Sequence, residues 1–259
     1  MGKVFLITSG KGGVGKSTLA SSLAIALSES GHSVLLVDTD IGLRCDDLML
    51  DMQNSIIYDF GDLMENPETE NALQQHPVYR GLYLLSAPQM MTAGEVEKKR
   101  FRRMIGALKG RFDFVLLDSP AGVGRSLKNT LGCADETIVV CTMDDVSLRD
   151  AEKIGQLLSE ANEAHPSVVF NKVDKSLIKS GAVPVPEAAA LSLDMPLLGV
   201  IPFSRSVSRA LITHTSAYEC DDKRVYREIE NIAARMMGQS VPHHRYKASL
   251  LTRLRKDRR

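Results

Sequence analysis

Short apolar runs recur along the chain and alternate with segments of helical pattern. We expect buried strands at 4–7, 34–37, 82–85, 113–118, 137–142, 168–174 and 197–201. Helices are expected between them, most clearly at 19–27, 93–108, 147–158 and 226–237, and residues 65–81 are expected to form a loop with a short helix. This order predicts an α/β fold of three layers, with a mainly parallel twisted sheet between two layers of helices. Ligands bind such sheets at the carboxyl ends of the strands.

A glycine-rich segment, GKGGVGKST at 10–18, directly follows the first apolar run. Gly10, Gly15, Lys16 and Ser17 match the phosphate-loop (P-loop) pattern G-x-x-x-x-G-K-[ST], in the required order of strand, loop and helix. Backbone N–H groups, the helix N-terminus and the lysine of such a loop all attract phosphate. We therefore predict a P-loop NTPase whose nucleotide contacts Gly10, Lys11, Gly12, Gly13, Val14, Gly15, Lys16, Ser17 and Thr18.

Aspartates stand at the ends of two predicted strands. Asp38 and Asp40 follow the run at 34–37, and Asp118 ends the run at 113–118. Alone, each is equally typical of a turn or a helix cap. Beside a P-loop they indicate magnesium chemistry, with Ser17, Asp38 and Asp118 as the metal site and Asp40 orienting the attacking water.

The string KGGVGKST resembles the deviant P-loop of the MinD/ParA family of ATPases. The resemblance extends over residues 1–238 and includes DIGLR at 40–44, SIIYDFGDL at 55–63 and SAPQ at 86–89. It implies ATP and Mg²⁺ as cofactors, catalytic roles for Lys11, Lys16 and Asp40, and a homodimer in which Lys11 reaches the partner's phosphates. Without the resemblance, Lys11 is an ordinary loop lysine. Cys45 stands where the family usually has an asparagine that helps to position water, so the rate of hydrolysis stays open.

The second half of the run at 168–174 bears on the choice of base. Asn171, Lys172 and Asp174 also fit the guanine-reading tetrad of GTPases, which makes GTP the alternative nucleotide. The family resemblance implies instead that Asn171 and Lys172 read adenine, that Pro202 and Phe203 cradle the base, and that Asp174 caps a turn. We expect ATP.

Net charge is zero, with 32 basic and 32 acidic residues, which gives no reason to expect nucleic acid. The basic cluster at 98–103 is interpreted as a solvated helix face, because no aromatic platform for bases accompanies it. The four cysteines have no metal-ligand spacing and fit reduced thiols in a cytosol. We expect no signal peptide, and no stretch has the apolar length of a spanning helix.

Charge is concentrated at the C-terminus. Residues 245–259 carry a net charge of +6, so the rest of the chain carries −6. Tyr246, Leu250, Leu251 and Leu254 fall near one face of a helix there, which favours a segment that folds at an anionic lipid surface. A disordered basic tail and a nucleic-acid contact are alternatives. We divide the chain into an ATPase domain at 1–238 and a linker with a membrane-targeting segment at 239–259.

The resemblance also suggests a biological role. Within the family it is closest to the ATPases that place the division site, which bind the inner face of the cell membrane from the cytoplasm. The expected partners are a division inhibitor and an ATPase-activating protein of the MinC and MinE kind. A flagellar-number regulator, a ParA-type positioning ATPase and an ATP-binding scaffold with little hydrolysis are the alternatives.

Overall fold

The sheet at the centre of the computed structural model has the strand order β3-β4-β2-β5-β1-β6-β7-β8. The structure describes residues 2–161 and 166–246. All pairings are parallel except that of β3 with β4, which is antiparallel. The predicted strands are therefore confirmed, whereas β3 was missed because two polar residues give no apolar signal. The strands are β1 (Lys3–Thr8), β2 (Val34–Asp38), β3 (Gln74–Gln75), β4 (Leu82–Leu85), β5 (Phe114–Asp118), β6 (Glu136–Cys141), β7 (Ser167–Val173) and β8 (Leu197–Pro202).

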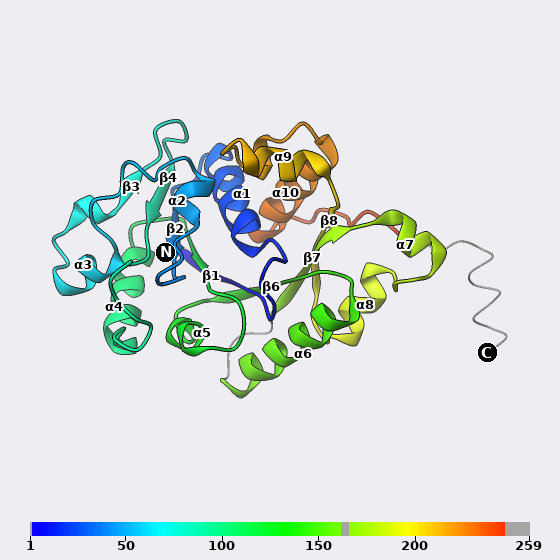
Figure 1. Ribbon diagram of the computed structural model, residues 1–259, viewed down its shortest axis with the longest axis horizontal. Helices are drawn as coiled ribbons and strands as arrows, with labels where there is room; N and C mark the ends of the chain where they lie inside the picture. Colours follow the sequence, from blue (N-terminus) through cyan, green and yellow to red (C-terminus); the bar gives the residue numbers. More distant parts are fainter. Residues whose placement is uncertain (1, 162–165, 247–259) are drawn as a thin grey trace.

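Helices cover both faces of the sheet, as predicted (Figure 1). One face carries α1 (Lys16–Glu29), α2 (Asp46–Met49), α9 (Arg205–Ile212), η2 (Ala217–Glu219) and α10 (Lys223–Met236). The other carries α3 (Phe60–Glu65), α4 (Lys98–Lys109), α5 (Arg125–Thr130), α6 (Asp145–Glu160), α7 (Lys175–Ser180) and α8 (Pro186–Ser192), with the short η1 (Glu70–Ala72) beyond α3.

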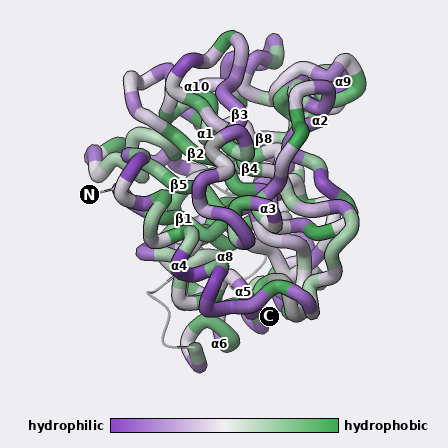
Figure 2. The backbone as a smooth tube through the Cα atoms, turned by 90° about the vertical axis from the view of Figure 1, so that its left-hand side faces the viewer, coloured by the Kyte–Doolittle hydropathy of each residue, from purple (hydrophilic) through white to green (hydrophobic). Residues whose placement is uncertain are grey.

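Each face of the sheet has its own apolar core. Along β1, Phe5 and Ile7 belong to the core under α1 and α10, while Val4 and Leu6 belong to the opposite core. Successive side chains of a strand point to opposite faces, so a strand covered on both sides must be apolar throughout. Figure 2 shows these apolar strands inside, with more polar segments around them. Within the described residues, no helix has the length and apolarity to span a bilayer.

All four predicted helices begin at other residues than expected. Helix α6 begins at Asp145 rather than Ser147, and α10 begins at Lys223 rather than Tyr226. Helix α4 begins at Lys98 rather than Ala93, because Thr92 and Glu95 first close a turn through Thr92 N–H to Glu95 Oε2 at 2.6 Å and Glu95 N–H to Thr92 O at 3.0 Å. Helix α1 begins at Lys16 rather than Leu19, so the P-loop lysine lies in its first turn.

The segment after α10 lies against the body of the fold as far as residue 246. Arg235 donates from Nε to Val241 O at 3.1 Å and from Nη2 to Pro242 O at 3.3 Å. Lys175 Nζ lies 5.5 Å from the centre of the Tyr246 ring. The described part of the expected linker and targeting segment at 239–259, residues 239–246, is thus tethered to the body. The predicted amphipathic helix falls mostly in 247–259, outside the described residues.

Candidate functional site

A cavity of about 680 Å³ lies at the carboxyl ends of the strands, where the P-loop leaves β1. Its walls come from α1, the loop after β2, the ends of β7 and β8, and α9. Most of the predicted site residues line it, and they are Gly12, Gly13, Val14, Gly15, Lys16, Ser17, Thr18, Asp40, Asn171, Lys172, Pro202 and Phe203. Asp38 and Asp118 do not line the cavity and are buried beside it.

Gly10 and Gly15 shape the loop for different steric reasons. A Cβ atom on Gly10 would lie 2.5 Å from the carbonyl oxygen of Asp150, so α6 approaches the loop too closely for a side chain. Gly15 has φ of +93°, and its Cβ would lie 2.3 Å from Asn171 Nδ2. Gly10 does not line the cavity and therefore acts on the loop's position.

Lys11 does not line the cavity of its own chain either. Its Nζ lies 3.8 Å from Asp144 Oδ1, and the two side chains are 46% and 50% exposed. An exposed pair of this kind contributes little to stability and separates easily. Lys11 is thus available to a facing surface.

Lys16 and Asp118 form a buried ion pair, with Lys16 Nζ 2.9 Å from Asp118 Oδ1 and the side chains 8% and 1% exposed. Burial lowers the pKa of Lys16, but the charge and hydrogen bond of Asp118 outweigh it, so the net shift is upward. Lys16 Nζ also donates to Ser17 Oγ at 3.2 Å. The P-loop cation, the hydroxyl and the strand-end carboxylate therefore meet at one point.

Asp38 holds the loop that follows β2, residues 39–46, which we call the switch loop. Its Oδ1 accepts from Asp40 N–H at 2.8 Å, and its Oδ2 accepts from the N–H groups of Cys45 at 2.9 Å and Asp46 at 3.2 Å. Burial and the nearby Asp118 raise the pKa of Asp38 to about 6 despite these donors. Asp38 and Asp118 are register partners on adjacent strands.

Asp40 and Cys45 form the switch-loop side of the cavity. Asp40 is half-buried, and burial raises its pKa although Lys16 opposes the shift. Burial and nearby carboxylates raise the pKa of the Cys45 thiol to about 11, so this thiol is neutral near pH 7. It is a weak hydrogen-bonding group where the family has an amide.

Asp46 was not predicted as a site residue. It is completely buried, burial and the charges of Asp118 and Asp38 raise its pKa well above the ordinary value, and neither carboxyl oxygen has a hydrogen-bond partner among the described residues. The sequence signal was the acidic pair at 46–47 directly before an apolar residue. Its burial depends on the packing of α2 against α1, which no local pattern reveals.

Asn171 and Lys172 brace the P-loop from β7. Asn171 Nδ2 donates to Val14 O at 2.9 Å, and Lys172 Nζ donates to Gly13 O at 2.7 Å. Asp174 instead caps α7 by accepting from Ser176 N–H at 2.8 Å, and it does not line the cavity.

The far end of the cavity is apolar and comes largely from a helix that the sequence analysis missed. Val207 and Leu211 of α9 line it together with Pro202 and Phe203. Ser204 caps α9 by accepting from Ser206 N–H at 3.2 Å, and this cap was the available signal for the helix.

The basic residues of α4 at 98–103 are all exposed, as expected for a solvated helix face, whereas Phe101 between them is buried.

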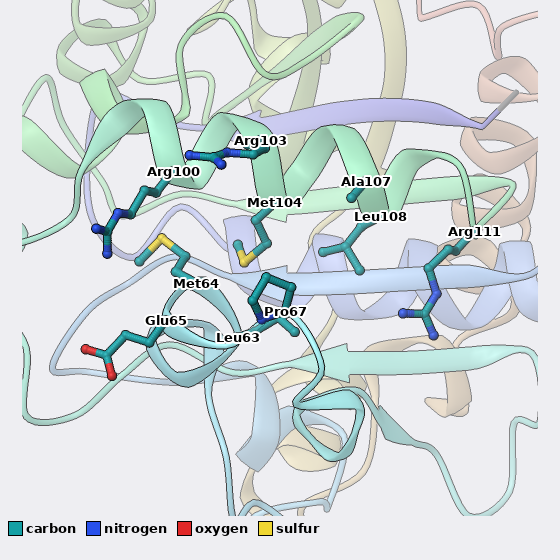
Figure 3. Close-up of a pocket in the computed structure, with 10 residues that line it drawn as sticks. All are labelled: Leu63, Met64, Glu65, Pro67, Arg100, Arg103, Met104, Ala107, Leu108 and Arg111. Atoms are coloured by element: carbon teal, nitrogen blue, oxygen red, sulfur yellow. The ribbon is translucent and has the colours of Figure 1, made fainter.

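Away from the nucleotide cavity, α3 and α4 border a groove of about 440 Å³. Figure 3 shows its apolar residues between Arg100 and Arg103 at one end and Arg111 at the other. Arg100 is paired with Glu97 at 2.9 Å.

A parallel sheet whose first strand enters this glycine loop, with a lysine of the following helix paired to a carboxylate at the end of the adjacent strand, defines a P-loop NTPase. A ParA family model, described as NUBPL iron-transfer P-loop NTPase, matches residues 1–237. The chain belongs to the MinD/ParA family of P-loop NTPases.

Curated relatives and solved structures agree with this assignment. The chain is 38% identical to the septum site-determining protein MinD of Bacillus subtilis over 246 residues, which cover 93% of this chain and 91% of the relative. It is 34% identical to MinD of Helicobacter pylori, with coverage of 96% and 95%. The MinC:MinD cell division protein complex of Aquifex aeolicus matches with a TM-score of 0.86 and 30% identity, covering 94% of this chain and 99% of that one. MinD complexed with Mg-ADP from Pyrococcus horikoshii matches with a TM-score of 0.80 and 27% identity, covering 91% and 96%.

Proposed function

We propose that this protein is an ATPase that places the division site, and that ATP-dependent dimerisation controls its attachment to the membrane. The observation that carries the proposal is the juxtaposition of Lys16 and Ser17, which line a nucleotide-sized cavity, with the buried carboxylate of Asp118. Similarity to MinD over nearly the whole chain supports the division role.

The donor set fits Mg²⁺. A hydroxyl from Ser17 and carboxylates from Asp38 and Asp118 are the hard oxygen ligands that this ion prefers. Bound there with nucleotide, Mg²⁺ supplies charge neutralisation to the β- and γ-phosphates. The chain's own contribution is positional, because Lys16 and the loop N–H groups bind the phosphates while Asp38 fixes the switch loop.

Asp40 is the residue that we assign to orienting the attacking water. It lines the cavity on the side of the switch loop, its N–H donates to Asp38 Oδ1 at 2.8 Å, and its carboxyl is close enough to Lys16 for that charge to act on its pKa. In Asp40→Ala we expect phosphate release to fall about 100-fold or more, with ATP still bound. A phosphate-release rate equal to that of the wild type would remove Asp40 from the mechanism.

We assign ATP rather than GTP as the nucleotide. The aspartate of a guanine-reading tetrad must reach the base, whereas Asp174 caps α7 outside the cavity. Competition of unlabelled ATP and GTP against a fluorescent ADP analogue tests this choice, and tighter competition by GTP would reverse it.

Lys11 supports the proposed homodimer. It is half-exposed, it precedes the P-loop residues that line the cavity, its Nζ lies 3.8 Å from Asp144 Oδ1, and it does not line its own cavity. We expect Lys11→Ala to stay monomeric with ATP in light scattering, while the wild type dimerises. A dimer of Lys11→Ala with ATP would exclude the crossing role.

The membrane part of the proposal concerns residues 245–259, of which 247–259 lie outside the described residues. Because residues up to Tyr246 contact the body, a chain ending at Tyr246 removes the basic segment and keeps the tether through Arg235. We expect the full chain to sediment with anionic liposomes in ATP and this shortened chain to stay in solution. Equal sedimentation would refute the tail as the anchor, and retention on duplex DNA instead would favour the ParA-type alternative.

The second candidate, an ATP-binding scaffold with little hydrolysis, is favoured by Cys45. A neutral thiol replaces an amide that helps to position water. Cys45→Asn tests it, because the scaffold reading predicts phosphate release that is negligible in the wild type and appears in the variant.

A further inference from the structure

Asp46 is a buried carboxyl group that the functions assigned above do not use. Its residue is 0% exposed, and neither Oδ1 nor Oδ2 finds a hydrogen-bond partner among the residues that the structure describes. An unpaired buried polar group destabilises a fold, and an apolar side chain of similar size avoids the penalty. Such a group in a native site calls for a functional explanation.

The surroundings of Asp46 are those of the metal site. Its strongest electrostatic neighbours are Asp118, Asp38 and Lys16, and its N–H donates to Asp38 Oδ2 at 3.2 Å. Cys45 and Met49 on either side of it along α2 line the cavity, whereas Asp46 does not. Asp46 therefore lies in the buried layer beside the cavity, together with Asp38 and Asp118, which do not line the cavity either.

The adjacent Asp47 shows what a structural carboxylate looks like at this place. It is also buried, but Arg44 Nε donates to its Oδ2 at 2.7 Å, and Leu48 N–H donates to its Oδ1 at 2.9 Å. Of these two neighbouring aspartates, Asp47 thus has hydrogen-bond partners on both carboxyl oxygens, whereas Asp46 has none among the described residues.

We propose that Asp46 is a positioning residue of the magnesium site, whose carboxyl oxygens accept hydrogen bonds from water in the coordination shell of Mg²⁺. The inference rests on the proposed function, since it requires Mg²⁺ to enter with the nucleotide. Mg²⁺ keeps several of its waters in such sites. Outer-shell acceptors orient these waters, and losing one typically costs 10- to 100-fold in metal affinity.

The test measures how much Mg²⁺ tightens ADP binding. The dissociation constant of a fluorescent ADP analogue is determined in magnesium chloride and in EDTA, for the wild type, Asp46→Asn, Asp46→Leu and the control Asp47→Asn. We expect the magnesium-dependent gain to fall about tenfold or more in both Asp46 variants. ADP affinity in EDTA stays at the wild-type value, and Asp47→Asn retains the full gain.

The melting temperature without nucleotide is a second readout. If Asp46 had a structural role, its replacement would lower this temperature, whereas the proposed role predicts a rise. We expect Asp46→Leu to melt about 2–10 °C above the wild type, because it removes an unpaired buried polar group. Asp47→Asn melts lower, since it weakens a satisfied ion pair.

Two results would overturn the role of Asp46. One is an unchanged magnesium-dependent gain in both Asp46 variants, and the other is a lower melting temperature of Asp46→Leu. Failure of the proposed function looks different, because the wild type itself then binds ADP without any effect of Mg²⁺.

Discussion

Arg235 links the stability of the ATPase body to the position of the C-terminal segment. Its Nη1 lies 3.2 Å from Glu228 Oε1 and 2.7 Å from Leu198 O, and the Arg235 and Glu228 side chains are 8% and 11% exposed. Glu228 Oε1 also accepts from Val200 N–H of β8 at 3.1 Å. Removal of the arginine therefore leaves a buried carboxylate and unpaired carbonyl oxygens.

Arg235→Met keeps most of the buried side-chain volume and removes the charge and the donors. Breaking a buried pair from one side costs about 3–5 kcal/mol. Taking the lower end, about 3 kcal/mol, we expect the melting temperature to fall by about 6–12 °C for a chain of this size.

Thermal and urea unfolding of the full chain, followed by circular dichroism, measure the effect. Arg224→Met is the matched control in the same helix, because Arg224 pairs with Asp222 at 2.6 Å but is 63% exposed, and such a pair contributes at most about 1 kcal/mol. Adding Glu228→Gln to Arg235→Met removes the orphaned charge and keeps an acceptor for Val200, so part of the loss returns. If Arg235→Met has the same melting temperature as the wild type, the buried pair of Arg235 and Glu228 does not stabilise the fold.

Two further predictions concern the loop geometry and pH. Gly10→Ala should destabilise the chain by about 1–3 kcal/mol, because its Cβ meets the Asp150 backbone at 2.5 Å, whereas Gly12→Ala, with open space around the site, should unfold like the wild type in urea. His76 Nδ1 accepts two backbone N–H groups, and burial lowers its pKa, so its stabilising effect is complete above pH 6.5 and is lost as pH falls below that value. Urea titrations at pH 7.5 and pH 5.5 should show this loss in the wild type and not in His76→Gln; equal losses would assign the effect to other groups.

Much of the fold follows from short-range patterns in the sequence. A strand covered on both faces is a short apolar run, and each parallel strand of the sheet has one. The P-loop is equally local, because glycine conformation and phosphate binding depend on consecutive residues. The ends of helices were predicted less accurately. At α4 a turn closed by the Glu95 side chain and Thr92 precedes the helix, which therefore begins later in the sequence than predicted.

The rest of the site depends on contacts between distant segments. Gly10 is a glycine because α6 passes over it, and Asn171 reaches Val14 across 157 positions of the chain. The burial of Asp46 follows from the docking of a four-residue helix on α1. Periodicity cannot reveal such packing, because it reports only which face of one element is apolar.

Asp38 shows how one of these distant contacts joins chemistry to shape. Its two oxygens accept three N–H groups of the switch loop, including those of Asp40 and Cys45, which both line the cavity. If Asp38 also holds Mg²⁺, as we propose, a change in its charge or its ligands weakens or strengthens these bonds. The position of the switch loop is thus tied to the state of the phosphate site through a single side chain. Asp40 and Cys45 line the same cavity as Gly12 and Gly13, which follow Lys11 in the P-loop, so this contact connects nucleotide state to the segment that we propose for dimerisation.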